Sequence, residues 1–133
     1  GVEPFLVCSA ATGIVAQRMV RRICPNCSCE IEASPLEKSA YEKEMGEKAE
    51  NFLYGVGCEL CAYSGYRGRT GIFEILPLSD EIRMLILNGA SASQIRGQAL
   101  KEGMIPLIRD GMLKVKQGIT TVSEVLRNAY FVE

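Results

Sequence analysis

The chain has 133 residues, of which 47% are hydrophobic and 23% are charged, and its 15 basic and 16 acidic side chains leave a formal net charge of -1. This composition excludes a wholly disordered chain, and the balanced charge argues against general nucleic-acid binding, which needs a basic surface. No apolar run reaches the roughly 18 residues of a transmembrane helix, so we expect one ordinary domain or two very small ones, without a membrane span.

The N-terminal third predicts mixed secondary structure. The chain opens at Gly1 without an initiator Met or a basic leader, which indicates a piece of a longer protein and no secretory signal. Residues 4–12 predict one or two helical turns, which a glycine then ends. Residues 14–23 favour a strand, although a helix is nearly as plausible from the pattern. Ser34, followed by a proline and then by a glutamate three residues after the serine, predicts a helix that runs to about Glu50.

The rest of the chain predicts turns, one strand and then helices. Residues 51–71 contain five glycines and predict tight turns rather than regular structure. Residues 69–76 are β-branched and aromatic and predict a strand that ends at Pro77. Capping residues and spaced apolar residues then predict four helices with one buried face each. These helices run from Ser79 to about Leu87, from Ser91 to about Glu102, from Pro106 to Gln117, and over Val122–Asn128 after a capping box of Thr121 and Glu124.

Four of the six cysteines form two matching pairs with two residues between the members of each pair. Such a spacing lets both sulfurs of a pair point at one centre, and two pairs supply the ligands of a tetrahedral zinc site. Because the chain has no histidine, a zinc site must use four sulfurs. The 30 residues between the pairs exceed the spacing of a simple zinc ribbon, and an inserted helix could fill that gap. The predicted metal ligands are Cys24, Cys27, Cys58 and Cys61.

Other interpretations of the cysteines compete with zinc. A disulfide-stapled secreted domain is disfavoured because no signal peptide is present, and a thioredoxin-like dithiol needs one reactive pair rather than two equivalent ones. An iron–sulfur cluster also takes four thiolates, and the sequence does not exclude it. Cys8 and Cys29 are expected to be bystanders, and the apolar neighbours of Cys8 predict that it packs in a core.

The sequence contains no recognisable catalytic motif. It has no histidine base, no Gly-x-Ser-x-Gly elbow and no Gly-x-x-x-x-Gly-Lys-[Ser/Thr] loop that would hold a triphosphate. The glycine-rich residues 65–71 precede a predicted strand and therefore lack the helix N-terminus that would bind phosphate. We interpret the scattered carboxylates as solvated charge. The chain itself is thus predicted to be no enzyme.

Several segments closely resemble one ATPase family over nearly the whole chain. The resemblance is to the C-terminal domain of the type II secretion and type IV pilus assembly ATPases, the general secretion pathway protein E family. It implies an α+β fold: the end of a RecA-like ATPase core, an inserted tetracysteine zinc-binding subdomain and a C-terminal helical bundle. The implied domains are 1–23 and 62–77 for the end of the core and its return strand, 24–61 for the metal-binding insertion, and 78–133 for the helices. The segments that carry the resemblance are Val15–Cys27, Cys58–Cys61, Gly65–Leu76, Glu102–Met104, Asp110–Met112 and Thr120–Arg127.

The resemblance also implies a function for the longer protein. The longer protein would be a hexameric cytoplasmic ATPase, peripheral at the inner membrane, that powers type II protein secretion by assembling a pseudopilus. Type IV pilus assembly is the alternative. Its partners would be the rest of the ATPase chain, neighbouring subunits and an inner-membrane platform protein, with no nucleic acid. ATP and magnesium would bind only upstream, where the Walker boxes of the family lie. The family's metal ligands match the same four cysteines, with zinc as a structural staple.

The arginines near the cysteines have several interpretations. Arg18 and Arg22 could face a neighbouring subunit or a nucleotide phosphate, and surface salt bridging is at least as plausible. Arginines on both sides of the pairs could offset the two excess negative charges of a zinc tetrathiolate. Two further alternatives stay open: an autonomous zinc-ribbon module that binds nucleic acid, and a redox switch of Cys24 and Cys27. The nucleic-acid module would use Arg18, Arg21, Arg22, Arg67 and Arg69.

Overall fold

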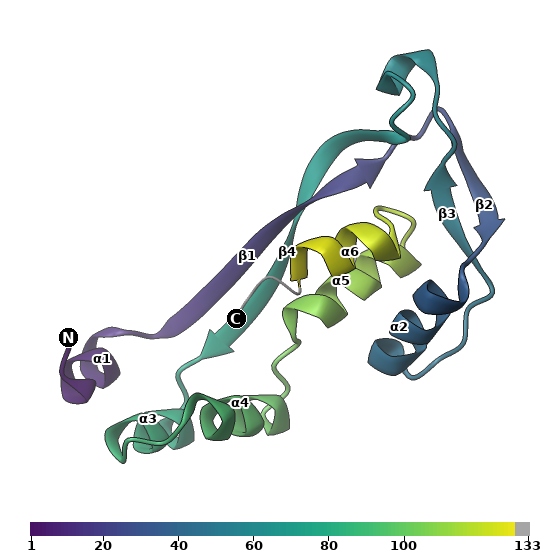
Figure 1. Cartoon of the computed structure of the whole chain (residues 1–133). Helices are drawn as coiled ribbons and strands as arrows, with labels where there is room; N and C mark the ends of the chain where they lie inside the picture. Colours follow the sequence, from purple (N-terminus) through teal and green to yellow (C-terminus); the bar gives the residue numbers. More distant parts are fainter. Residues whose placement is uncertain (130–133) are drawn as a thin grey trace. The chain divides into compact units, whose positions relative to one another are not determined.

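The computed structural model describes residues 1–129 and shows an α+β chain, as the resemblance implied. Residues 130–133, the end of the predicted domain 78–133, lie outside the described residues. Figure 1 shows the elements in chain order. They are α1 (Pro4–Ala10), β1 (Gly13–Ile23), β2 (Ser28–Glu32), α2 (Pro35–Met45), β3 (Asn51–Gly55), the 3₁₀ helix η1 (Glu59–Cys61), β4 (Tyr66–Pro77), α3 (Asp80–Leu87), α4 (Ala92–Lys101), α5 (Leu107–Lys116) and α6 (Val122–Ala129).

The chain packs as two compact units. Among the described residues, unit 1 comprises residues 1–16 and 74–106, and unit 2 comprises residues 17–73 and 107–129. The strands β1 and β4 pair as a two-stranded sheet, and each strand passes from one unit into the other. The four C-terminal helices, which the resemblance groups into one bundle, are divided: α3 and α4 belong to unit 1, and α5 and α6 to unit 2.

Unit 1 is held by packing among its three helices. Helix α3 packs against both α1 and α4. Leu78, Ile82 and Ala99 form the buried core of this unit. Cys8 is buried here, with its Sγ 3.6 Å from the carbonyl oxygen of Arg83, so the prediction that Cys8 packs in a core is confirmed.

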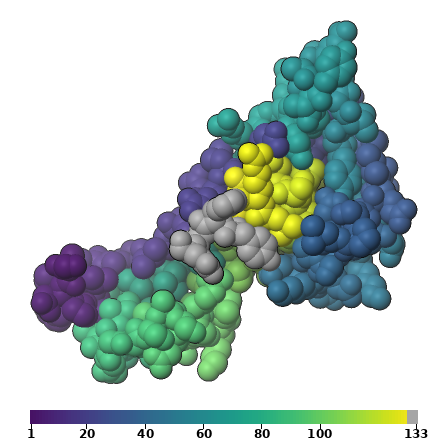
Figure 2. Space-filling model, in the orientation of Figure 1, coloured from purple at the N-terminus to yellow at the C-terminus, as the bar shows by residue number. Residues whose placement is uncertain are grey.

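Unit 2 combines an antiparallel ladder with three helices. Strands β2 and β3 pair in the register Ser28↔Gly55 to Glu32↔Asn51. Helix α2 packs against α5 and α6, and Figure 2 shows the yellow α6 lying against the blue residues of α2. The largest core of this unit gathers apolar side chains from α2, β3, α5 and α6. Its buried members are Ala33, Tyr41, Phe52, Met112, Val115, Val122 and Val125.

Some predicted elements agree with the structure and others differ. The strand over residues 14–23 is confirmed as β1, and its helical alternative is wrong. Helix α2 begins after the predicted Ser34 cap, but it ends at Met45 because Gly46 takes a left-handed φ of 70° and closes the last turn. Residues 51–71 were expected to lack regular structure, whereas they contain β3 and the start of β4. The ladder with β2, for which the sequence analysis predicts no strand, supplies the hydrogen bonds that make β3 a strand.

The four helices predicted after residue 78 are confirmed as α3 to α6. Ser79 and Ser91 accept backbone N–H bonds from Ile82 and Gln94, as N-cap residues do. Within residues 1–129, no helix is long and apolar enough to cross a membrane.

Candidate metal centre and its surroundings

The two cysteine pairs lie in two turns that the β2–β3 ladder brings together. Cys24 and Cys27 lie in the turn between β1 and β2. Cys58 directly precedes η1 and Cys61 is its last residue, between β3 and β4. The ladder pairs Ser28, the residue after the first turn, with a residue three positions before Cys58. Residues that are 34 positions apart in the chain thereby meet in space.

The four sulfurs form a compact cluster. All lie within 4.8 Å of one another. The Sγ atoms of Cys24 and Cys58 are 3.9 Å apart, those of Cys27 and Cys61 are also 3.9 Å apart, and those of Cys58 and Cys61 are 3.7 Å apart. A zinc ion with bonds of about 2.3 Å to sulfur separates its tetrahedral ligands by about 3.8 Å. The four cysteines are therefore close enough to hold a metal, and their spacing fits a tetrahedral one.

Cys29 and Cys8 stand outside this cluster. Cys29 follows Cys27 by only two residues, yet it lies on β2 opposite Tyr54. Cys8 is buried in unit 1. The structure thus gathers the four predicted ligand residues and places both predicted bystanders elsewhere.

Hydrogen bonds from N–H groups surround the sulfurs and favour their ionised form, because a donor stabilises a thiolate more than a thiol. Three backbone amides and one side-chain amide donate. The bonds run from the backbone N of Gly57 to Cys27 Sγ (3.3 Å), from the backbone N of Cys58 to Cys61 Sγ (3.2 Å), from the backbone N of Gly65 to Cys61 Sγ (3.3 Å), and from Asn26 Nδ2 to Cys58 Sγ (3.3 Å).

The thiol pKa values follow from burial and from these donors. Burial opposes ionisation of Cys61, but the N–H groups of Cys58 and Gly65 outweigh it and lower the pKa of Cys61 to about 6. The amide of Asn26 lowers the pKa of Cys58. At Cys27, burial outweighs the amide of Gly57 and raises the pKa to about 12. The lowered pKa of Cys61 favours the thiolate form that a metal needs.

Glycines let the two turns approach each other. A Cβ atom at Gly55 would collide with the backbone of Gly65, and one at Gly65 would collide with the backbone of Gly55. The amide of Cys24 also donates to the carbonyl of Gly65 at 2.9 Å. Backbone contact at this point, where no side chain fits, sets the spacing of the two cysteine pairs.

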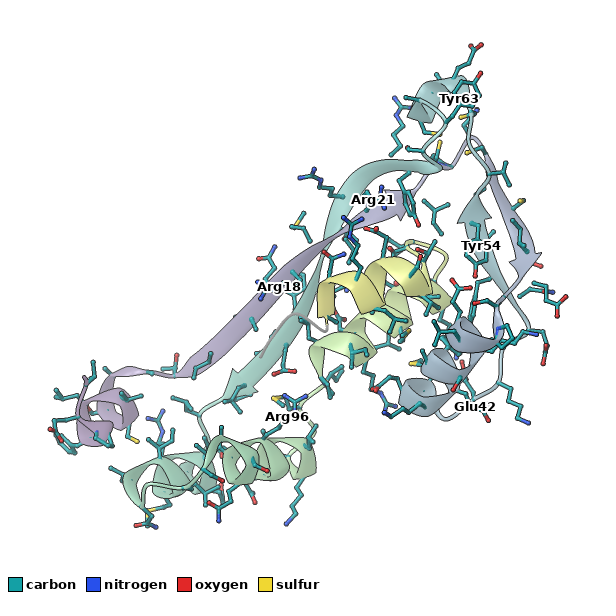
Figure 3. The ribbon with its side chains drawn as sticks, in the orientation of Figure 1. Arg18, Arg21, Glu42, Tyr54, Tyr63 and Arg96 are labelled. Carbon is teal, nitrogen blue, oxygen red and sulfur yellow. The ribbon has the colours of Figure 1, made fainter. Side chains whose placement is uncertain are left out.

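A buried carboxylate ties the strand before the metal centre to α6. Glu124 is only 4% exposed, and its Oε2 accepts from the backbone N of Arg21 at 2.9 Å while its Oε1 accepts from Arg21 Nη2 at 2.6 Å. The Arg21 guanidinium lies over the Tyr66 ring, 4.1 Å from its centroid, and the Tyr66 hydroxyl is 2.9 Å from Thr121 Oγ1. Thr120 Oγ1 donates to the carbonyl of Arg21 at 2.8 Å. Figure 3 shows Arg21 on β1 beside α6.

The Arg21–Glu124 contact shows that the prediction of a solvated carboxylate is wrong for Glu124. Thr121 does cap α6 by accepting from the amide of Glu124 at 3.3 Å, but the Glu124 carboxylate is engaged by Arg21 and is buried rather than solvated. Burial would raise the pKa of Glu124, but hydrogen bonds and charge from Arg21 outweigh it and lower that pKa. Val122 and Val125 share the core face of α6, and Glu124 lies off that face, so the local pattern gave no signal of its burial.

The other arginines near the cysteines differ from Arg21 in exposure and in ion pairing. Arg18, Arg22, Arg67 and Arg69 are exposed, and none of them has an ion-pair partner among residues 1–129. The expected surface salt bridges of Arg18 and Arg22 are therefore not found in the described chain.

The chain matches known proteins along nearly all of its length. The model of the family described as "Type II/IV secretion system protein" matches residues 1–127. The type IV pilus assembly ATPase PilB of Thermus thermophilus is 43% identical over 127 residues, which cover 95% of this chain and 14% of that protein. The type II secretion system ATPase E of Vibrio cholerae is 40% identical over 129 residues, which cover 96% of this chain and 25% of that protein.

A further relative is the type IV pilus assembly ATPase PilB of Myxococcus xanthus, 38% identical over 130 residues, which cover 96% of this chain and 23% of that protein. The chain thus spans between 14% and 25% of the length of these three relatives. The family match covers the positions of all four clustered cysteines. The chain belongs to the type II/IV secretion system protein family.

Proposed function

We propose that this chain is the zinc-stabilised C-terminal portion of an ATPase that powers type II protein secretion through pseudopilus assembly. Type IV pilus assembly is the alternative, since relatives with both names match the chain at similar identity. The observation that carries the proposal is the cluster of four sulfurs within 4.8 Å in a chain of this family. Such a cluster suits a structural metal.

The role of Cys24, Cys27, Cys58 and Cys61 is to hold zinc as a staple. A zinc ion bound by four thiolates has no open coordination position, so it closes a loop and does no catalysis. Closing this loop matters because β2 buries little: its five residues are exposed except for the partly exposed Cys29. Metal coordination can supply on the order of 10 kcal/mol where apolar burial cannot.

The coupling role rests on contacts within unit 2. Arg21 lies three residues before Cys24, and Tyr66 lies five residues after Cys61. Both side chains bind residues of α6 or the segment before it, through Glu124 and Thr121. The turns that carry the two cysteine pairs, residues 24–27 and 58–61, are called the metal turns below. A displacement of the metal turns therefore displaces α6, so this part of the chain can pass a movement from one surface of unit 2 to another.

The remaining parts of the proposal concern the longer protein. Residues 1–23 and 62–77 would form the end of a RecA-like core. The rest of that core, ATP with magnesium and the Walker boxes would belong to the rest of the longer chain, since this sequence has no triphosphate loop. Six copies would assemble at the cytoplasmic face of the inner membrane and act on a platform protein there. The family resemblance supports these points, and this chain would be a noncatalytic element of the motor.

Measuring the metal content tests whether the four clustered cysteines hold a structural zinc ion. Mass spectrometry under native conditions is expected to find one zinc per chain, with the four clustered thiols protected from thiol reagents until a chelator is added. Cys61→Ser should lose the zinc, whereas Cys29→Ser, a change two residues from a ligand but outside the cluster, should keep it. A chain with no metal and one easily oxidised pair at Cys24 and Cys27 would contradict the staple and favour the redox switch.

The same two substitutions in the full-length protein test the motor role. Cells that carry Cys61→Ser should lose protein secretion or pilus assembly, and which of the two is lost identifies the machine. Cells that carry Cys29→Ser should retain it. If zinc is lost from the Cys61→Ser protein while both processes continue normally, the chain's metal is not needed for the motor and the coupling proposal fails.

A further inference from the structure

A hollow of about 530 Å³ borders the metal turns in unit 2. Its lining comes from the end of β1, the first cysteine turn, the start of β4 and the segment after α5. Arg22 and Arg67 both line it, together with the side chains of Ser28 and Gln117. None of the described residues that line it is acidic. A hollow lined by two cations and no anion carries a positive field.

Arg22 and Arg67 differ from four other cations of unit 2 in having no carboxylate partner among residues 1–129. Arg21, Lys38, Lys114 and Lys116 each have a carboxylate partner. In the part of the chain that the structure describes, Arg22 and Arg67 have no ion pair and no side-chain hydrogen bond. Their donors are therefore available to a ligand.

Two neighbouring hollows in the same unit contain carboxylates as well as cations. One contains Glu30 and Glu47 beside Lys116. Another contains Arg69 and Arg127, but the carboxylate of Glu124 also lines it. Cationic side chains thus line other hollows, but in those two a carboxylate is already present.

The Arg22 side chain passes close to the backbone of β4. Gly68, on β4, has a φ of 82°, and a Cβ atom placed on it would lie 3.7 Å from Arg22 Cδ. The stem of Arg22 therefore runs over Gly68, the residue that follows Arg67. This crossing brings two guanidinium groups from different strands to one hollow.

From this arrangement we propose that the hollow is a binding site for a phosphate group, carried by a phosphate monoester or a polyphosphate. The planar fork of a guanidinium matches phosphate oxygens with paired hydrogen bonds. Two unpaired cations balance a phosphate monoester, which carries nearly two negative charges at pH 7. The volume lies within the range of ligand pockets, about 300 to 1,000 Å³, and exceeds what a bare phosphate needs.

The lining also indicates that the site does not recognise a base. Its apolar members are Ile23, Pro25 and Ile119, and no aromatic ring lines it in the described chain. A site without a ring offers no platform on which a base can stack. Recognition thus rests on the phosphate, and the inference goes beyond the proposed motor role and does not depend on it.

A rival role for the two arginines is to offset the metal centre. Pro25 lines the hollow and lies between Cys24 and Cys27, and a zinc tetrathiolate carries two excess negative charges. If this is the whole role of Arg22 and Arg67, their removal weakens zinc binding and the hollow binds no phosphate. The two roles therefore predict different measurements.

The test is a titration of the zinc-loaded chain with inorganic phosphate and with pyrophosphate, in a low-salt buffer free of phosphate. Calorimetry should show saturable binding of one ligand per chain, and amide NMR shifts should centre on Gly68 and Gly118. Arg22→Gln and Arg67→Gln should each weaken binding by about tenfold or more, the range for hydrogen bonds to a charged group. Arg18→Gln, which removes an exposed and unpaired arginine of β1 outside the hollow, is the matched control and should leave binding unchanged.

Zinc content is measured in each variant. No saturable binding by the wild-type chain, equal losses in Arg18→Gln, or a loss of zinc that accounts for the weaker binding would each overturn the proposal. Vesicles with phosphatidic acid, compared with vesicles of phosphatidylcholine alone, identify the source. If the chain binds phosphatidic acid vesicles more tightly than free pyrophosphate, and this binding needs Arg22 and Arg67, the phosphate is that of a lipid headgroup; tighter binding of pyrophosphate indicates a soluble ligand.

Discussion

The two units of this chain are stabilised by different physical means. Unit 1 relies on helix packing around Leu78, Ile82 and Ala99 and on serine caps at the starts of α3 and α4. Unit 2 has a larger apolar core, and it adds the Arg21–Glu124 pair and the four clustered thiols. Under the proposed function, a metal held by these thiols would compensate for the small apolar burial of β2 and of the cysteine turns.

Exposed apolar side chains in and beside the metal turns support this proposal. Val56, Leu60 and Tyr63 are 63%, 60% and 72% exposed, so they contribute little to any core of the described chain. Figure 3 shows Tyr63 at the tip of its turn, away from the helices of unit 2. Because these side chains bury little area, we expect the order of residues 56–64 to depend on the cysteines.

The largest expected effect is that of removing the metal, which should destabilise unit 2 and leave unit 1 largely unchanged. Chelation or Cys61→Ser is expected to abolish hydrogen-exchange protection of the turns and of β2 and β3, with a loss on the order of 10 kcal/mol of binding free energy. The amides of α3 and α4 should keep their protection, because unit 1 contains none of the clustered cysteines. Equal loss of protection in α4 would show that the units do not differ in their dependence on metal.

Removing the buried charge in unit 2 should have the next largest effect. Glu124→Gln puts an amide NH₂ against one of the Arg21 donors and should cost about 2 kcal/mol of unfolding free energy, as for a hydrogen bond to a charged group. The exposed Glu42→Gln in the same unit should change the urea midpoint very little. A similar shift in both variants would mean that loss of any carboxylate, rather than this contact, is responsible.

The pH dependence of that contact has a defined direction. Arg21 holds the pKa of Glu124 below its unfolded value of about 4.3, so the stabilisation is complete above that pH and declines as the pH falls through the folded pKa. The stability difference between wild type and Glu124→Gln should therefore be constant near pH 7 and shrink in acid. A difference that grows in acid would contradict the pairing.

A pair of glycines gives opposite expectations in the two units. Gly111 lies in α5, where a Cβ atom would collide with Val125, so Gly111→Ala should destabilise unit 2 by about 1–2 kcal/mol even after the gain in helix propensity. Gly97 lies in α4 with no atom within 4 Å of its would-be Cβ. Gly97→Ala should therefore stabilise unit 1 by up to about 1 kcal/mol. Urea denaturation with amide exchange distinguishes the two signs.

The smallest expected effect concerns a helix cap of unit 1. Ser91 Oγ accepts from the backbone N of Gln94 at 3.3 Å, and Gln94 Oε1 accepts from the backbone N of Ser91 at 2.9 Å. Ser91→Ala should cost about 1 kcal/mol. Ser93→Ala, an exposed change two residues into α4, is the control and should be neutral or slightly stabilising. Amide exchange in α4 measures both, and a loss in Ser93→Ala equal to that in Ser91→Ala would argue against a capping effect.

Much of the candidate site could be predicted because its chemistry is local. Two residues between the cysteines of each pair are enough to place both sulfurs on one side of a turn, and the lack of histidine restricts the donors to sulfur. The meeting of the two pairs could not be predicted in the same way. It depends on the β2–β3 ladder, in which β2 alternates too weakly in hydropathy to be recognised.

The sequence by itself determined the elements whose signals lie within one turn: the caps at Ser34, Ser79 and Ser91, and the spacing of the cysteine pairs. Side chains a few residues apart satisfy the free N–H groups of a helix start, so no distant residue is needed. Only the tertiary structure decided the division of the helices between two units and the burial of Glu124 against Arg21, 103 residues away. Such contacts depend on the strands and helices that bring distant segments together, and no local pattern encodes them.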